Sequence, residues 1–350
     1  MKDIAKVVFV IIGTFIGAGF ASGQEIYIFF FKYGINGLVG ITISSLILGI
    51  IISRTLKIIK ENNIQNYKEF LDIIINKKYN LKIKQQKNKK LTQFINIIVN
   101  TFILVTFFIM IAGFGTYFMQ QFGLNQLIGS SILALITYVI LNTNVKGVVK
   151  ASEIIVPILI ISVIIIGLMN LNNLPLLQIK NYLIPNNSPE FVLEAMLYAS
   201  YNSILLIPVL ITLNKYIKNK KQTTIIGMIS ALIILIMSVL IFLLLTKVDV
   251  DIENIEMPVV YVVSNMLKIL EYVYGFIILG SIFTTTISLG VSFLQNTSKN
   301  KKSYTQIAII MCITSVIVSK IGFSNLVNML YPIFGYLGIL QIYKILTKKV

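Results

Sequence analysis

Histidine and tryptophan are absent from this chain of 350 residues, and cysteine occurs once, as Cys312. Without histidine, a histidine-based metal site is excluded, and any proton relay must use carboxylates, tyrosines or water. A single cysteine excludes an intrachain disulfide and carries no information about the redox compartment. The sequence also shows no nucleotide-binding loop, nucleophile–base constellation or metal-ligand cluster. This argues against an enzyme and against a bound cofactor.

Charged residues are scarce, at 12% of the chain against 56% for hydrophobic residues. An average soluble domain carries about 25% charged residues. The apolar residues here form uninterrupted blocks instead of the stripes of an amphipathic surface helix, so they must face lipid or one another. The sequence therefore predicts an integral membrane protein. With tryptophan absent, the aromatic belt at the membrane interfaces must be built from the 17 tyrosines.

Apolar runs long enough to cross a bilayer, which takes about 20 residues, recur along the whole chain. They predict one all-α membrane domain over 1–350 with ten transmembrane helices. The expected spans are 4–31, 35–59, 92–118, 124–141, 151–171, 189–213, 223–246, 270–295, 305–320 and 323–346. The strip Met257–Leu267 is apolar but too short to cross, so we expect a helix that lies against the outer side of the bundle.

Basic residues produce the net charge of +17, and their placement indicates an orientation instead of a nucleic-acid partner. With the N-terminus in the cytoplasm, nearly all lysines and arginines fall in inside segments. The exceptions are Lys32, Lys180, Lys247, Lys268 and Lys320. Ten spans with both termini in the cytoplasm preserve this asymmetry, whereas an odd number would scramble it. The abundance of isoleucine, lysine and asparagine is typical of an AT-rich bacterial genome and predicts a bacterial plasma membrane.

The longest hydrophilic stretch is 60–91, between the second and third spans. Its apolar residues recur at helical spacing and predict an amphipathic helix on the inner leaflet. These residues are Ile64, Tyr67, Phe70, Leu71 and Ile74. A lysine-rich run from Lys77 to Lys90 follows, and we expect it to contact anionic lipids of the bilayer.

The first span contains the string GTFIGAGFASGQE, from Gly13 to Glu25, whose glycines would each weaken a continuous helix by up to about 1 kcal/mol. Glycine permits an unwound turn with free N–H and C=O groups. The final SGQE fits a capping box, with Ser22 as N-cap of a second half-helix and Glu25 as its partner. Two alternatives stay open: a tight small-xxx-small crossing through Gly13 and Gly17, and a signal peptide cleaved near 18–23.

The sixth span carries a matching feature. It opens with an N-cap and proline at Ser188-Pro189, and we expect an interruption at the polar run 199–203, before Pro208. The alternative is a simple proline kink. The breaks fall in the first span of each group of five. Because five is odd, repeat 1 (about 1–171) and repeat 2 (about 188–346) must be inverted. Interrupted spans at equivalent positions of inverted halves indicate a transporter site.

Ten helices with a glycine break in the first and a polar break in the sixth resemble the amino acid–polyamine–organocation superfamily. The string GAGFASGQE is similar to that of the YkvI-type family of bacterial proteins, which are regarded as amino acid permeases. The resemblance implies the five-plus-five inverted-repeat fold of the bacterial leucine transporter. It also implies a secondary transporter that takes up an amino acid or similar small solute by alternating access, coupled to Na⁺ or H⁺.

The resemblance further implies a cation site. In sodium-coupled relatives, two adjacent hydroxyl residues of the eighth helix join backbone carbonyls of the first helix around Na⁺. By motif position, these are Thr284 and Thr285 with the carbonyls of Gly13 and Ile16. Uncharged oxygen ligands suit Na⁺, and a helix break frees the carbonyls. The alternative is that the hydroxyls only bond to the preceding turn of their own helix.

A substrate is expected between the two breaks. The N–H groups of Gly17, Ala18 and Gly19 are candidates for holding a carboxylate at the start of a half-helix. Hydroxyl groups and apolar walls would complete the site. These remaining candidates are Phe20, Ser200, Tyr201, Thr286 and Leu289.

Two acidic residues within the spans are candidates for proton coupling, because a charge at the bilayer centre costs about 2.5–3.5 kcal/mol on insertion scales. Glu25 is either a capping-box partner alone or also a proton or cation site. Glu194 lies in the outer half of the sixth span, where it would pair with a substrate amine or carry a proton.

The alternative function is a ligand-sensing receptor subunit of the germinant-receptor type without net transport. The sequence leaves the substrate and the oligomeric state open.

Overall fold

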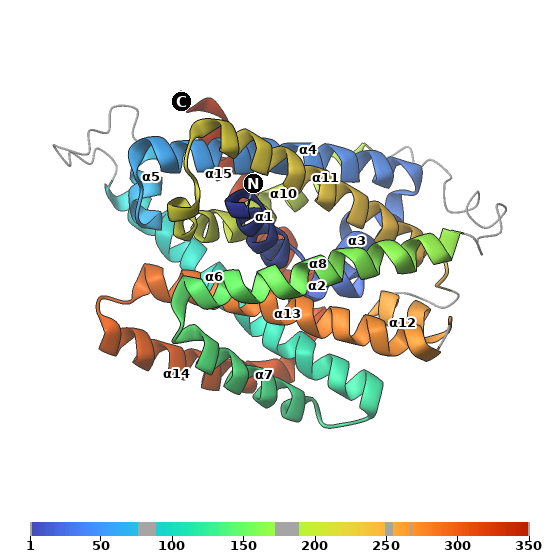
Figure 1. The fold of residues 1–350 in the computed structure, drawn as a ribbon. Coiled ribbons are helices and arrows are strands. Elements are labelled where there is room, and N and C mark those ends of the chain that lie inside the picture. Colours follow the sequence, from blue (N-terminus) through green and yellow to red (C-terminus); the bar gives the residue numbers. More distant parts are fainter. Residues whose placement is uncertain (1, 76–88, 172–188, 249–254, 267, 349–350) are drawn as a thin grey trace.

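The computed structural model describes residues 2–75, 89–171, 189–248, 255–266 and 268–348, which form a bundle of helices (Figure 1). Eight of the described helices are long and apolar enough to cross a membrane. They are α4 (Ile35–Asn62), α6 (Lys89–Phe122), α8 (Asn144–Leu171), α10 (Glu190–Thr212), α11 (Lys220–Leu245), α13 (Lys268–Thr297), α14 (Lys301–Val318) and α15 (Phe323–Thr347). The prediction of a multi-pass, all-helical membrane protein is confirmed.

Two predicted spans correspond to shorter elements. The fourth is α7 (Gln126–Leu141), and the first is divided into α1 (Lys2–Phe15), α2 (Ala18–Ser22) and α3 (Gln24–Phe29). Two short helices lie between spans, namely α5 (Tyr67–Ile75) in the hydrophilic stretch and α12 (Pro258–Ser264) in the predicted outer strip. Single 3-10 turns are η1 (Phe31–Tyr33), η2 (Asn214–Tyr216) and η4 (Ser319–Ile321). Most of the lysine-rich run and the predicted cap at Ser188 lie outside the described residues.

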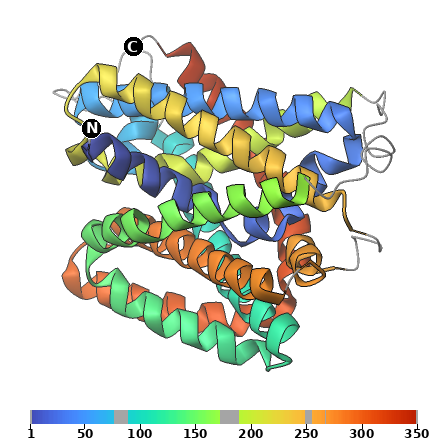
Figure 2. The same ribbon diagram turned by 45° about the vertical axis from the view of Figure 1, so that its right-hand side comes forward.

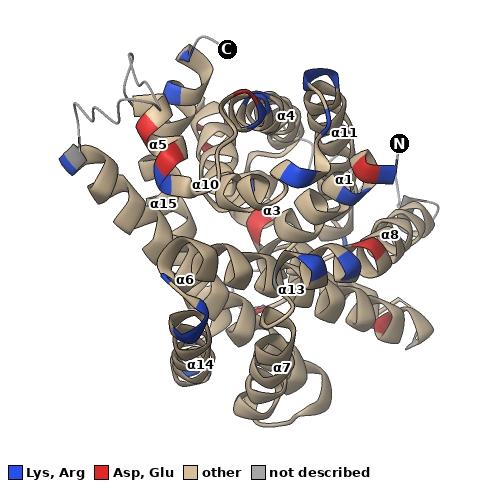
Figure 3. Ribbon diagram, turned by 60° about the vertical axis from the view of Figure 1, so that its left-hand side comes forward, with Lys and Arg blue, Asp and Glu red and all other residues tan. Residues whose placement is uncertain are grey.

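The helices form two groups when they are seen nearly end-on (Figure 3). In one group α4 contacts α11 and α10, and α10 contacts α15. In the other, α6 contacts α7 and α13, while α14 contacts α7. Helix α1 contacts members of both groups, including α8, α11 and α13. The two chain ends lie at the same end of the bundle in Figure 2, and α12 (orange) lies at the other.

Close helix crossings depend on small residues. At the contact of α4 with α11, a Cβ atom added to Gly227 would lie 2.5 Å from the carbonyl oxygen of Gly49. A Cβ on Gly49 would lie 2.7 Å from that of Ala231. The backbones can approach this closely because neither glycine carries a side chain. On the outer faces of the bundle, large apolar side chains are exposed, as expected for contact with lipid. Examples are Leu135, Ile161, Met228 and Ile310.

The predicted interruption of the sixth span is wrong. Helix α10 continues through the whole polar run 199–203, and Pro208 lies inside it. The side chains of Asn202 and Ser203 donate to backbone carbonyls one turn earlier, at 3.0 and 2.6 Å. Because these polar groups are satisfied on their own helix, the run does not require a free helix end.

Candidate functional site

The first span is interrupted at Ile16–Gly17. Gly17 has an extended backbone (φ −92°, ψ −166°), and its N–H donates to the carbonyl two residues earlier, at 3.0 Å. The N–H of Ala18 donates to the sulfur of Met110, at 3.3 Å. In a continuous helix these two N–H groups would bond to the carbonyls of Gly13 and Thr14. The break therefore frees these two carbonyl oxygens for other partners.

The freed carbonyls meet two hydroxyl groups of α13. The Oγ1 atom of Thr285 lies 2.8 Å from the carbonyl oxygen of Gly13, 3.1 Å from that of Ile16 and 3.3 Å from that of Thr14. The Oγ1 atom of Thr284 lies 3.0 Å from the carbonyl oxygen of Gly13. The structure thus brings the four predicted cation-site residues together. Both hydroxyls reach beyond their own helix, and that of Thr284 also lies 3.0 Å from the carbonyl oxygen of Ser281 in the preceding turn. A buried cluster of neutral oxygens at a helix break suits a small monovalent cation.

The first span is interrupted a second time at Gly23, and the capping box predicted there from Ser22 and Glu25 is wrong. Gly23 has a left-handed backbone (φ 87°), which ends α2, and α3 begins after it without a side-chain cap. Ser22 is the last residue of α2 and donates to the carbonyl of Gly19 at 3.1 Å. Because glycine adopts this backbone without steric cost, the chain turns here without the cap. The carboxylate of Glu25 therefore takes other partners.

Glu25 faces the interior of the protein and is 3% exposed. The Tyr201 hydroxyl on α10 donates a hydrogen bond to its carboxylate, and the backbone N–H of Phe20 also bonds to it. The Tyr201 ring stacks on Phe29, with centroids 5.5 Å apart, and on Tyr331 of α15, with centroids 4.7 Å apart. Aromatic packing from α3 and α15 therefore holds the hydroxyl that contacts Glu25.

No ion pair of the described residues includes Glu25. Several ion pairs of the described residues join side chains that retain solvent exposure. Examples are Lys6–Glu153, Lys32–Glu194, Asp3–Lys218 and Glu61–Lys220. In Figure 3 the red segment of α3, which holds Glu25 as its acidic residue, lies toward the middle of the bundle. A buried carboxylate is costly unless it is protonated or paired with a cation.

Two of the N–H groups predicted to hold a substrate carboxylate, those of Gly17 and Ala18, have partners within the protein. The N–H of Ala18 already donates to Met110. A Cβ added to Gly17 would lie 2.9 Å from the Met110 sulfur, and one added to Gly19 would lie 2.9 Å from Cγ of Glu25. In this conformation the Glu25 side chain therefore fills the space on the Cβ side of Gly19.

The other predicted substrate residues divide into two sets. Phe20 and Tyr201 lie beside Glu25, as described. The hydroxyl of Ser200 instead donates to a carbonyl of α15 at 2.6 Å, and that of Thr286 to a carbonyl of its own helix at 2.6 Å. Leu289 is fully buried on α13. The structure does not direct the Ser200 and Thr286 hydroxyls to the Glu25 cluster.

Glu194 lies apart from this cluster. Its carboxylate pairs with Lys32 at 3.3 Å, and both side chains retain solvent exposure. It precedes Tyr201 by seven residues on α10, which corresponds to about 10 Å along a helix. Exposed ion pairs contribute little to stability. The structure therefore does not bring the two predicted proton-coupling residues together.

Several residues of the site were not found from the sequence. Tyr198 packs edge-on against Phe30, with centroids 4.8 Å apart, and its buried hydroxyl lies near Glu25. Its spacing of three from Tyr201 places both on one helix face, a signal that sequence reasoning could have used. Gln24 donates to the carbonyl of Ile255 at 2.6 Å. Contacts of this kind, between distant segments, leave no local pattern in the sequence.

These features define a membrane protein of the leucine-transporter fold. MhsT, solved in complex with L-phenylalanine, is 16% identical, with a TM-score of 0.71 over 96% of this chain and 87% of that chain. The Eremococcus coleocola manganese transporter, solved with an aromatic bis-isothiourea substituted compound, is 14% identical, with a TM-score of 0.66 over 98% of this chain and 78% of that chain. At these identities the likeness shows the fold.

Sequence comparison confirms the resemblance to the YkvI-type proteins. The chain is 27% identical over 347 residues to the uncharacterized membrane protein YkvI of Bacillus subtilis (strain 168), across 99% of this chain and 96% of YkvI. It is 23% identical over 352 residues to the uncharacterized protein YyaD of the same organism, across 98% of this chain and 97% of YyaD. No family model matches the chain.

Proposed function

We propose that this protein is a secondary transporter that moves an amino acid or a similar small solute by alternating access. The divided first span carries this proposal, because its breaks combine an oxygen cluster with a buried carboxylate. Transporters of this kind bind ions and substrates at discontinuous helices near the bilayer midplane. Two neighbours in fold support the class: one is a manganese transporter, and the other was solved with L-phenylalanine.

The proposed architecture has ten spans in two inverted halves, with α1–α3 as the first span and α7 as the fourth. Helix contacts support this count. The contact of α1 with α8 has its counterpart in that of α10 with α15, and α4, α6 and α7 contact their equivalents α11, α13 and α14. Both termini then lie on the cytoplasmic side of a bacterial plasma membrane. The position of both chain ends at one end of the bundle supports this (Figure 2).

Cation coupling is the second part of the proposal. Na⁺ would be held by Thr284 and Thr285 with the carbonyls of Gly13 and Ile16, and so would join α1 to α13. A proton, or the amine of the solute, would bind at Glu25. Both routes place positive charge beside the broken span. Glu25 is the stronger candidate for this role than Glu194, which is paired with a lysine near the surface.

Uptake of labelled amino acids into proteoliposomes, with an imposed Na⁺ or pH gradient, tests the proposed function. We expect saturable accumulation that collapses when ionophores dissipate the driving gradient. Saturable binding without accumulation under either gradient would reject the transporter and favour the ligand-sensing receptor. Thermal stabilisation by candidate solutes measures binding separately, because a ligand that binds only the folded state raises its apparent stability.

A further inference from the structure

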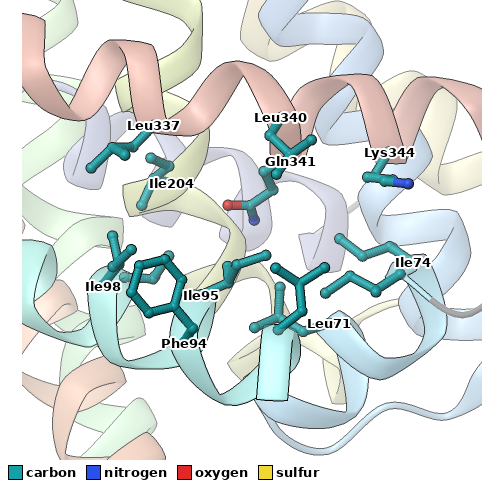
Figure 4. A pocket seen from close by; sticks show the side chains of 13 residues that line it. Leu71, Ile74, Phe94, Ile95, Ile98, Ile204, Leu337, Leu340, Gln341 and Lys344 are labelled. Carbon is teal, nitrogen blue, oxygen red and sulfur yellow. The ribbon is translucent and has the colours of Figure 1, made fainter. Parts of the chain in front are cut away.

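A cavity of about 120 Å³ lies between α5, α6, α10 and α15, at the end of the bundle near the C-terminus (Figures 1 and 4). Its walls are mainly apolar, with Leu71 on α5, Ile98 on α6 and Ile204 on α10 among them. Phe94 and Leu337 at its edge are 61% and 45% exposed. In a membrane protein, exposed apolar side chains of this size face lipid, so the cavity lies beside the bilayer.

Two polar side chains line this cavity, Gln341 and Lys344. Gln341 is 5% exposed, its amide points toward α6 in Figure 4, and its Nε2 atom has no hydrogen-bond partner among the described residues. The Tyr67 hydroxyl lies beside Gln341, but their contact does not meet the geometry of a hydrogen bond, and the hydroxyl has no other partner among the described residues. An unmet buried donor destabilises the folded state, because the group has lost its hydrogen bonds to water. A ligand that supplies an acceptor would remove this cost.

Water is a poor occupant of this cavity. A water could bond to Gln341 or Lys344, but most of the wall is apolar and offers it no partner, so water alone fills the cavity poorly. An occupant that suits the walls must be mostly hydrocarbon, with an acceptor that reaches Gln341. The cavity of about 120 Å³ is also several times larger than the roughly 10–15 Å³ that a cavity needs, on the same measure, to hold one water.

The order of side chains along α15 indicates what this occupant is. Lys344 lies near the end of the helix, Gln341 lies about 4.5 Å further inward by helical rise, and Leu340 and Leu337 follow. A positive charge, a hydrogen-bond donor and an apolar wall therefore succeed one another from the membrane surface inward. A phospholipid presents the complementary series, with a phosphate, an ester carbonyl and an acyl chain in the same order.

We propose that this cavity binds an anionic phospholipid from the leaflet on the side of the chain termini. The acyl chain fills the apolar part, the ester carbonyl accepts a hydrogen bond from Gln341, and the phosphate binds the Lys344 ammonium group. Because Ile204 lies one turn beyond Tyr201 on α10, the bound lipid also contacts the helix that holds the Glu25 cluster. The proposal depends on the membrane position of the protein and is independent of transport.

The absence of tryptophan from the chain gives a direct test. A Phe94→Trp variant carries its sole tryptophan at the mouth of the cavity. Ile225→Trp is the matched control. Both side chains are exposed, and each lies five residues after the lysine that begins its helix, Phe94 on α6 and Ile225 on α11. Ile225 does not line this cavity. Each full-length variant is reconstituted in phosphatidylcholine vesicles with a few mole per cent of phosphatidylglycerol whose acyl chains are brominated.

We expect quenching of the Phe94→Trp variant to correspond to an enrichment of about five-fold over the bulk membrane, and unbrominated phosphatidylglycerol to reverse it. Adding Gln341→Leu and Lys344→Met should reduce quenching to the level of the control. Gln341→Leu preserves the side-chain volume while removing the unmet donor, so thermal unfolding should confirm a folded variant.

Three results would overturn the proposal. They are equal quenching of the Phe94→Trp and Ile225→Trp variants at every mole fraction, excess quenching that survives the Gln341→Leu and Lys344→Met changes, and equal excess with brominated phosphatidylcholine. The first would show that the cavity is closed to lipid or already filled by the protein. The second would remove Gln341 and Lys344 from the site, and the third would remove the requirement for an anionic headgroup.

Discussion

A carboxyl group inside a helical bundle avoids the cost of burial either by keeping its proton or by binding a cation. Glu25 has a tyrosine hydroxyl and a backbone N–H as partners, and none of the described ion pairs includes it. Because it also fills the space over Gly19, movement of its side chain would open that space to a ligand. In the proposed transporter, Glu25 would therefore affect both the charge of the site and access to it.

A Glu25→Gln variant separates this role from packing. The amide has the same shape and its oxygen still accepts the hydrogen bond of Tyr201, but it cannot carry a proton or balance a cation. We expect uptake driven by a pH gradient to fall at least about ten-fold, the effect of about 1.4 kcal/mol, while thermal unfolding changes little. Glu153→Gln is the control, because Glu153 is a partly exposed acid paired with Lys6. Unchanged pH-driven uptake in Glu25→Gln would exclude Glu25 from coupling.

The two threonines of the oxygen cluster should differ in their effect on Na⁺ dependence. The Thr285 hydroxyl contacts two carbonyls of α1 and that of Ile16 in the break, whereas the Thr284 hydroxyl contacts one carbonyl of α1. We expect Thr285→Ala to raise the Na⁺ concentration for half-maximal uptake by about ten-fold, the effect of about 1.4 kcal/mol. Thr284→Ala should raise it less, because the Thr284 hydroxyl lies against fewer of the carbonyl oxygens that would hold the ion. Ser288→Ala is the control, since its hydroxyl bonds within α13. Unchanged Na⁺ dependence in both threonine variants would remove them from the site.

At the scale of the element, the direction of α3 depends on the backbone of Gly23. A left-handed conformation costs a residue with a side chain about 1–2 kcal/mol. At this position an added Cβ would also lie 2.6 Å from a methyl group of Val259 and 3.0 Å from one of Leu245. Gly23 is therefore constrained both by its dihedral angle and by the packing of α11 and α12 around it.

Paired alanine substitutions distinguish these two constraints. Gly123 also has a positive φ, of 64°, but nothing lies within 4 Å of its added Cβ. We expect Gly123→Ala to cost only the backbone strain of about 1–2 kcal/mol. Gly23→Ala should cost a further 1–3 kcal/mol, roughly the penalty of overpacking. Thermal unfolding in detergent measures both. Equal losses of stability would show that Val259 and Leu245 yield to the added methyl group.

The sequence predicted the elements better than their partners. Apolar length located the spans, and the glycines of the first span marked its breaks. Gly13 has a packing role as well, because a Cβ atom added to it would lie 2.8 Å from a methyl group of Val156. The capping box predicted from the SGQE string and the break predicted from the polar run of α10 were both wrong. A local pattern does not show whether a side chain caps a helix or bonds to another partner. Tyr331 contacts Tyr201 across 130 residues of sequence, which no local spacing encodes.

At the scale of the whole molecule, the distribution of charge predicts the orientation in the membrane. Helix α14 begins in a lysine-rich segment that includes Lys299, and Lys320 follows its last turn. The helix is apolar between these ends and meets the criteria for a membrane span. If the segment rich in lysine is cytoplasmic, then Lys299 and Lys320 lie on opposite sides of the membrane, and the other spans are oriented with them.

Cysteine labelling at the two ends of α14 tests this orientation. The natural Cys312 is buried and is removed as Cys312→Ser, which gives a background without thiols. Lys299→Cys and Lys320→Cys each place a thiol at an exposed position. We expect a membrane-impermeant maleimide to label Lys320→Cys in intact cells, and Lys299→Cys only after permeabilisation, because the positively charged loop stays in the cytoplasm. The reverse labelling pattern would show that the protein has the opposite orientation in the membrane. Labelling of both thiols in intact cells would show that α14 does not span the membrane.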